Sequence, residues 1–155
     1  MNSNTLSDPK VQTIVERSLV GKRIIYLLEN QYLGKVKDKM DNEPNCHGTV
    51  LYLIGEINLP RYAPPEEICD EKLDLRYPRV EETADAIIAV RNGLNNYLAH
   101  TGIYLGKVGD KRLVFEQNGK GGEFEFSDFG HFFQEYFEIS GQKFNTYNEV
   151  SFHRF

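Results

Sequence analysis

Residues 98–106 read Leu-Ala-His-Thr-Gly-Ile-Tyr-Leu-Gly, and this stretch decides the fold class. It predicts a core strand over 98–105, in which His100 shares one face with Gly102 and Tyr104. Ala86 to Val90, before it in the chain, is a short apolar run that ends in an Asn-Gly turn and predicts a strand. Three further strands are expected at 112–117, 122–126 and 149–155. The second half of the chain therefore predicts a mostly antiparallel sheet.

The first half of the chain has helical periodicity instead. Asp8 and Pro9 begin a predicted helix whose apolar face carries Val11, Ile14, Val15 and Leu19. A second helix is expected from Ile24 to about Tyr32, and a third over 46–54. A short helix is expected at 65–73, within a charged, proline-rich excursion (60–82). The last expected helix begins at Ser127-Asp128, and its apolar face carries Phe129, Phe132, Phe133, Tyr136 and Phe137. Helices followed by an antiparallel meander are typical of the α+β class, with N-terminal helices packed on the sheet.

Composition limits the classes of protein. The 155 residues predict a single domain over 1–155, with 18 Lys and Arg against 23 Asp and Glu and a net charge of −5. A negative net charge without blocks of basic residues disfavours nucleic-acid binding. The sequence has no apolar run of about 18 residues, so no membrane span is expected. A polar N-terminus without a secretory signal predicts a cytoplasmic protein, or one exported without a cleavable signal peptide.

The cysteines and histidines do not have the spacing of a zinc site, so we expect no metal and no cofactor. Two cysteines are also too few for a disulfide framework. The oligomeric state is left open by the sequence.

Cys46 is the residue most indicative of chemistry. It follows Asn45, which can cap a helix, and begins the helix expected over 46–54. The free N–H groups and positive dipole end of a helix favour an anion, which here is the nucleophilic thiolate. The Cys46 N–H would also serve as one oxyanion donor. The alternative is that Cys46 is a small buried apolar side chain.

A thiolate nucleophile needs a base, and His100 is the candidate. Its orienting partner is expected in the strand Val114-Phe115-Glu116-Gln117-Asn118, where Glu116 and Asn118 share one face and Gln117 points the other way. Both Glu116 and Asn118 remain candidates. The alternatives are a histidine hydrogen-bonded within the core and a polar strand end before a glycine-rich turn.

Three segments together resemble the papain-like NlpC and CHAP cell-wall hydrolases: Asn-Cys-His-Gly-Thr (45–49), His-Thr-Gly-Ile-Tyr-Leu-Gly (100–106) and Val-Phe-Glu-Gln-Asn-Gly (114–119). The resemblance covers about 24–126, and His100 follows Cys46 by 54 positions. It implies a papain-like fold and a cysteine peptidase or amidase that hydrolyses amide bonds of peptidoglycan-type peptides. By resemblance, Cys46 is the nucleophile, His100 the base, Glu116 or Asn118 the orienting residue, and Tyr32 an aid at the oxyanion.

His47 departs from the family pattern, which has a small polar residue there. Two other functions stay open: a non-catalytic binding module on the same fold, and a thiol acyltransferase. In the lecithin-retinol type of acyltransferase the histidine precedes the cysteine, whereas here the order is reversed. His131 and His153 are expected to be structural or at the surface.

Overall fold

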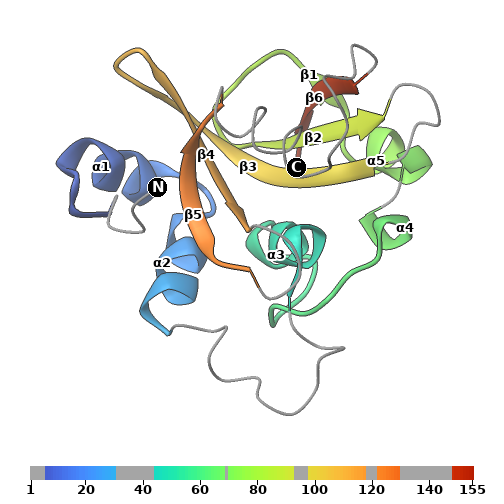
Figure 1. Ribbon diagram of the computed structural model, residues 1–155, viewed down its shortest axis with the longest axis horizontal. Coiled ribbons are helices and arrows are strands. Elements are labelled where there is room, and N and C mark those ends of the chain that lie inside the picture. Colours follow the sequence, from blue (N-terminus) through green and yellow to red (C-terminus); the bar gives the residue numbers. More distant parts are fainter. Residues whose placement is uncertain (1–5, 31–43, 69, 93–97, 118–121, 130–147) are drawn as a thin grey trace.

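Helices come first and strands second along the chain (Figure 1). The computed structural model describes residues 6–30, 44–68, 70–92, 98–117, 122–129 and 148–155. Its elements are α1 (Pro9–Arg17), α2 (Gly21–Glu29), α3 (Cys46–Leu53), α4 (Pro65–Ile68), α5 (Asp70–Arg76), β1 (Arg79–Val80), β2 (Ala86–Asn92), β3 (Leu98–Val108), β4 (Lys111–Gln117), β5 (Phe124–Asp128) and β6 (Asn148–Arg154). The predicted α+β class with an antiparallel sheet is confirmed.

The described strands form one sheet in the order β1-β6-β2-β3-β4-β5, and every neighbouring pair is antiparallel. The consecutive strands β2 to β5 form the meander that the sequence predicts. The last strand, β6, inserts between β1 and β2, so the C-terminus lies inside the sheet rather than at its edge. Neither this crossover nor the short strand β1 follows from local sequence pattern, because both depend on pairing over long sequence separations.

The central helix is α3, and every one of its eight residues is buried. It packs on β3 and β4, while α1 also contacts β3 (Figure 1). Apolar side chains of this helix, among them Val50 and Leu51, join those of α1 and α2 and the sheet residues Ile103 and Phe115 in the main core. A helix that is buried all round needs apolar residues on every side, which its sequence supplies.

A smaller apolar cluster covers the opposite face of the sheet. It consists of Ile88, Val90, Tyr104 and Val114, with Phe129, Val150 and Phe152 packed against it. The alternation of β3 therefore places Tyr104 in this cluster and its neighbour Ile103 in the main core. Both faces of the central strands are thus buried.

One expectation for an individual residue is wrong. Leu19 is 79% exposed, because α1 ends at Arg17 and Ser18 has an extended backbone. Residues 65–73, which were expected to be helical, lie in α4 and α5 on either side of residue 69. Ser127 and Asp128 are the last residues of β5, where they pair with Val114 and Leu113. Phe129 directly after them is helical, and the rest of the helix expected there lies outside the described residues.

No helix among the residues that the structure describes is both long and apolar enough to cross a membrane.

Candidate active site

Cys46 is the first residue of α3, as the sequence predicts. Its predecessor Asn45 has an extended backbone (φ −113°, ψ −178°), and its side chain accepts a hydrogen bond of 2.9 Å from the Gly48 N–H. The Asn45 carbonyl accepts the first helical bond, 2.9 Å from the Thr49 N–H. The predicted N-cap is confirmed, and the Cys46 N–H lies in the first turn, where backbone donors have no acceptor within the helix.

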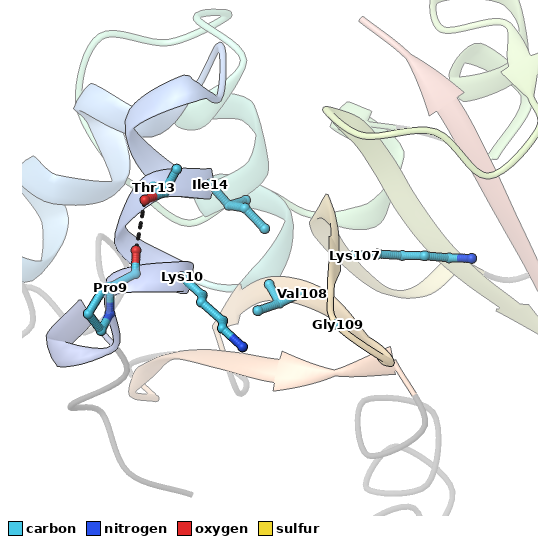
Figure 2. Close-up of a pocket in the computed structure, with 7 residues that line it drawn as sticks. All are labelled: Pro9, Lys10, Thr13, Ile14, Lys107, Val108 and Gly109. Carbon is cyan, nitrogen blue, oxygen red and sulfur yellow. Dashed lines mark hydrogen bonds between the residues drawn. The ribbon is translucent and has the colours of Figure 1, made fainter.

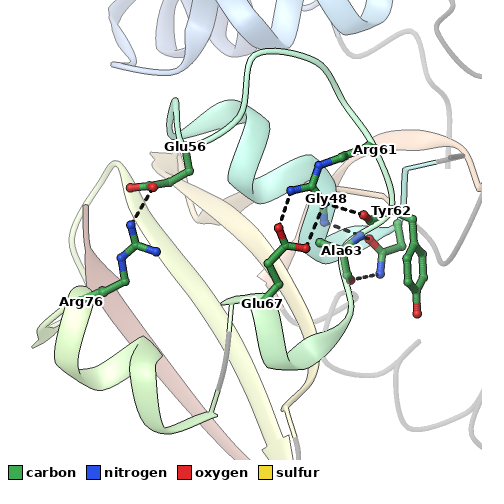
Figure 3. A network of polar contacts seen from close by, with 8 residues as sticks. Gly48, Glu56, Arg61, Tyr62, Ala63, Glu67 and Arg76 are labelled. Carbon is green, nitrogen blue, oxygen red and sulfur yellow. Dashed lines mark hydrogen bonds and ion pairs between the residues drawn. The ribbon is translucent and has the colours of Figure 1, made fainter.

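Asn45 also joins the segment after Pro60 to this helix start. Its Nδ2 donates to the Ala63 carbonyl at 2.7 Å, and the Ala63 N–H donates to its Oδ1 at 3.0 Å. Gly48 makes the close crossing possible, because a Cβ there would lie 1.6 Å from the Arg61 carbonyl oxygen. Arg61 in turn forms an ion pair with Glu67 (Figure 3). The first turn of α3 is therefore held against the segment that carries Arg61 and Ala63.

His100 lies beside a bulge in β3. Arg91 of β2 pairs with Leu98, whereas Val90 pairs with His100, so Ala99 has no counterpart on β2. Bulges bend a strand and re-aim its side chains. The buried His100 side chain interacts electrostatically with the Cys46 thiol, and its Nε2 lies 3.3 Å from Oε1 of Glu116.

The electrostatics of the site favour an ion pair. Burial raises the pKa of the Cys46 thiol, but hydrogen bonds and positive charge from His100 and His47 outweigh it and hold that pKa well below 9.0. Burial opposes charge on His100 as well, yet hydrogen bonds with Cys46 and Glu116 prevail and raise the pKa of His100 to about 10. Both shifts favour the charged pair, a thiolate on Cys46 and an imidazolium on His100.

Glu116 completes a line of three ionisable groups. Its side chain is buried, and among the described residues its Oε2 has no hydrogen-bond partner, so Oε1 alone is engaged, by His100. Gly102 leaves the room for this contact: a Cβ there would lie 3.0 Å from the Phe115 carbonyl oxygen and 3.5 Å from the Glu116 Cβ. The absence of a side chain at Gly102 therefore leaves space beside Glu116, whose carboxyl group contacts His100.

Gln117 faces the opposite way from Glu116, as strand parity predicts. Its Oε1 accepts a 2.6 Å hydrogen bond from the Thr49 hydroxyl of α3, and its Nε2 donates to the Gly122 carbonyl at 3.0 Å. Gln117 therefore ties the nucleophile helix to the sheet and does not contact His100 through these bonds.

His47 is the site residue whose contacts sequence reasoning did not anticipate. It is buried beside Cys46, and its Nδ1 lies 2.9 Å from the hydroxyl oxygen of Thr101. It also interacts electrostatically with the Cys46 thiol and lowers the pKa of that group. The available signal was Thr101 itself, a polar residue on the strand face that meets α3.

Of the remaining candidate residues, only His153 lies within the part of the chain that the structure describes. Asn118, Tyr32, Cys69 and His131 lie outside the described residues. His153 is buried, as a structural role requires: its Nδ1 lies 2.9 Å from the Tyr77 carbonyl oxygen, and its Nε2 lies 2.7 Å from the Ser151 hydroxyl.

A groove of about 400 Å³ lies elsewhere, between α1 and the β3–β4 turn (Figure 2). Lys10, Thr13 and Lys107 are its polar lining residues, and it contains no carboxylate, histidine or cysteine. The groove therefore offers no base or activated nucleophile, unlike the cluster around Cys46.

Comparison of the chain with protein-family models, with curated proteins and with solved structures finds no match. The chemistry of the site therefore rests on its own residues. Cys46 at a helix start, His100 and Glu116 form a Cys-His-Glu set of the kind suited to attack on a carbonyl carbon.

Proposed function

We propose that this protein is a cysteine hydrolase of amide bonds, with Cys46 as nucleophile, His100 as acid and base, and Glu116 as the orienting residue. The observation that carries the proposal is the position of His100, whose Nε2 lies 3.3 Å from Oε1 of Glu116 and whose ring interacts with the Cys46 thiol strongly enough to shift the pKa of both groups. A carboxylate on the far side of the ring fixes its orientation and stabilises the imidazolium.

The steps follow from these positions. The Cys46 thiolate adds to the carbonyl carbon, and His100 gives its proton to the amine as the C–N bond breaks, which leaves a thioester on the sulfur. Water then loses a proton to His100 and adds to the thioester, and the thiolate departs from the carboxylic acid product. The Cys46 N–H, at the start of α3, is placed to donate to the oxyanion in both additions.

The substrate class comes from the three sequence segments that resemble the NlpC and CHAP hydrolases, which favour peptides of the peptidoglycan type. A cysteine at the start of a buried helix, packed on an antiparallel sheet that carries the histidine, is also consistent with a papain-like fold. Asn118, which follows Glu116 by two positions, remains a second candidate for the orienting role.

The test is mass spectrometry of purified muropeptides and of cytosolic peptides after incubation with the protein. We expect cleavage at one amide bond, and loss of that product with Cys46→Ala and with His100→Asn. Thr49→Val is the matched control, because Thr49 is buried in the same helix but bonds Gln117. Product formed equally by Cys46→Ala would contradict the proposal.

The same experiment separates hydrolysis from acyl transfer. With glycine amide added as an acceptor, a transferase gives a product heavier by the acceptor, whereas a hydrolase gives the free acid. A folded protein that binds these peptides and converts none of them would instead be a binding module.

A further inference from the structure

Glu116 has a second buried carboxyl group directly opposite it in the sheet. Glu125 of β5 is its partner in the antiparallel ladder, so the two side chains leave the sheet on the same face. The residues on either side of Glu125, Phe124 and Phe126, belong to the main core on the other face. Glu116 is 3% exposed and Glu125 is 8% exposed. Two carboxyl groups therefore lie side by side, away from solvent.

Two negative charges at these positions would repel each other. Directly opposite residues of an antiparallel pair have Cβ atoms about 4.5–5.5 Å apart, and like charges there destabilise a sheet. Burial strengthens the repulsion, because water does not screen the two groups. When two carboxyl groups share such a site, one of them keeps a proton. Glu116 Oε1 lies 3.3 Å from Nε2 of His100, whose positive charge favours an ionised Glu116, so the proton belongs to Glu125.

We infer that Glu125 is a positioning residue of the active site, which keeps its proton at neutral pH and donates it in a hydrogen bond to Oε2 of Glu116. The inference deepens the proposed function and rests on it, because it takes Glu116 as the partner of His100. Among the described residues, Oε2 of Glu116 is a buried oxygen without a hydrogen-bond partner. An ionised Glu125 has no hydrogen to give, so this pair supplies Oε2 with a donor only when Glu125 is protonated.

The two oxygens of Glu116 then have separate tasks. Oε1 meets the imidazole, and Oε2 accepts the proton of Glu125. A buried carboxylate stays ionised more readily when hydrogen bonds reach its charged form, and a fixed carboxylate holds the imidazole in one orientation. Tyr104 and Arg112, further along the same strands, both contact Glu82 instead.

Infrared spectroscopy of the full-length protein tests the proton directly. A protonated carboxyl group has a C=O stretching band above the amide I band, and a carboxylate does not. We expect such a band at neutral pH in the wild type, and its loss in Glu125→Gln. Glu123→Gln is the matched control, because Glu123 is an exposed carboxyl group close by in the chain, and it should retain the band.

The rate at which iodoacetamide alkylates Cys46 at pH 6 tests the positioning role. Glu125→Gln replaces one neutral donor by another, so the rate should stay within about two-fold of the wild type. Glu125→Leu leaves Oε2 of Glu116 without a donor, which favours the neutral form of that carboxyl group and removes charge beside His100. We therefore expect Glu125→Leu to slow alkylation by about ten-fold.

A wild-type spectrum without a protonated carboxyl band at neutral pH would overturn the inference. Alkylation slowed about ten-fold in Glu125→Gln would overturn it as well, because that result requires an ionised Glu125. If Glu125→Gln does not fold, Glu125→Asp decides in protein made with isotope-labelled glutamate, where the band should lose its isotope shift.

Neither measurement needs a substrate, so the two proposals fail separately. A band from Glu125 in a protein that cleaves no peptide would refute the hydrolase proposal and leave the proton of Glu125 in place. Cleavage that depends on Cys46, by a protein without the band, would refute the role of Glu125 and leave the hydrolase proposal standing.

Discussion

The close crossing at Gly48 gives the most quantitative prediction. A Cβ at this position would lie 1.6 Å from the Arg61 carbonyl oxygen, and real Cβ atoms essentially never come within 3.0 Å of another heavy atom. Gly48→Ala must therefore separate α3 from the segment that carries Arg61 by about 1.4 Å. The obstructing atom belongs to the backbone, so rotation of a side chain cannot relieve the contact.

The displacement acts on the hydrogen bonds that join Asn45 to Ala63. Both are buried, at 2.7 and 3.0 Å, and loss of each leaves groups that cost about 1–3 kcal/mol when unsatisfied. Alanine in place of glycine stabilises a helix by about 1 kcal/mol, which offsets part of this loss. We therefore expect Gly48→Ala to lower the free energy of unfolding by about 1–5 kcal/mol, which for a chain of this size is a fall of roughly 3–15 °C in Tm.

Urea and thermal unfolding measure this loss, and alkylation of Cys46 in the native protein reports on the site. Gly55→Ala is the matched control: Gly55 has φ +87° and nothing within 4 Å of a Cβ, so the substitution strains the backbone by about 1 kcal/mol without a clash. It should leave Cys46 alkylation unchanged. A Gly48→Ala protein as stable as the wild type would refute the argument from the close crossing.

Three further predictions concern the site and its support. Glu116→Gln keeps the shape but removes the charge that stabilises the His100 imidazolium, so alkylation of Cys46 at pH 6 should slow by about ten-fold; an unchanged rate would mean that Glu116 has no electrostatic role. Gln117→Ala should lower the free energy of unfolding by about 1–3 kcal/mol yet leave turnover per folded molecule nearly intact, and a double-mutant cycle with Thr49→Val should give a coupling near 1 kcal/mol. Burial lowers the pKa of His153. The unfolded chain therefore binds more protons than the folded protein as pH falls below about 6.5, and the free energy of unfolding declines there. Urea titrations of His153→Gln should show a smaller decline between pH 7 and 5, and an equal decline would contradict the assignment.

The local parts of the site could be predicted from the sequence because they depend on neighbouring residues. Asn45 caps the helix that Cys46 begins, and both features follow from residue types within one turn. Strand parity likewise separates Glu116 from Gln117, and the structure places them on His100 and on Thr49 respectively.

The non-local parts could not be predicted in this way. β6 inserts between β1 and β2, and nothing within the residues of β6 encodes which strands it will join. Ser127 pairs with Val114 as part of β5, and the residues around Ser127 do not indicate which strand it will join. Each outcome depends on sheet pairing between segments far apart in the chain.

The contact between His47 and Thr101 shows how a bulge limits inference from parity. Regular alternation places His100 and Thr101 on opposite faces of β3, so that only one of them should meet the start of α3. Yet His100 interacts with Cys46 while Thr101 hydrogen-bonds His47, so two successive strand residues reach two successive helix residues. The unpaired Ala99 immediately before them is where the pairing of β2 and β3 slips by one residue, and the pairing is regular again from His100 to Tyr104. Because a bulge bends the strand at this point, alternation counted along β3 does not by itself determine which of its residues lie near the start of α3.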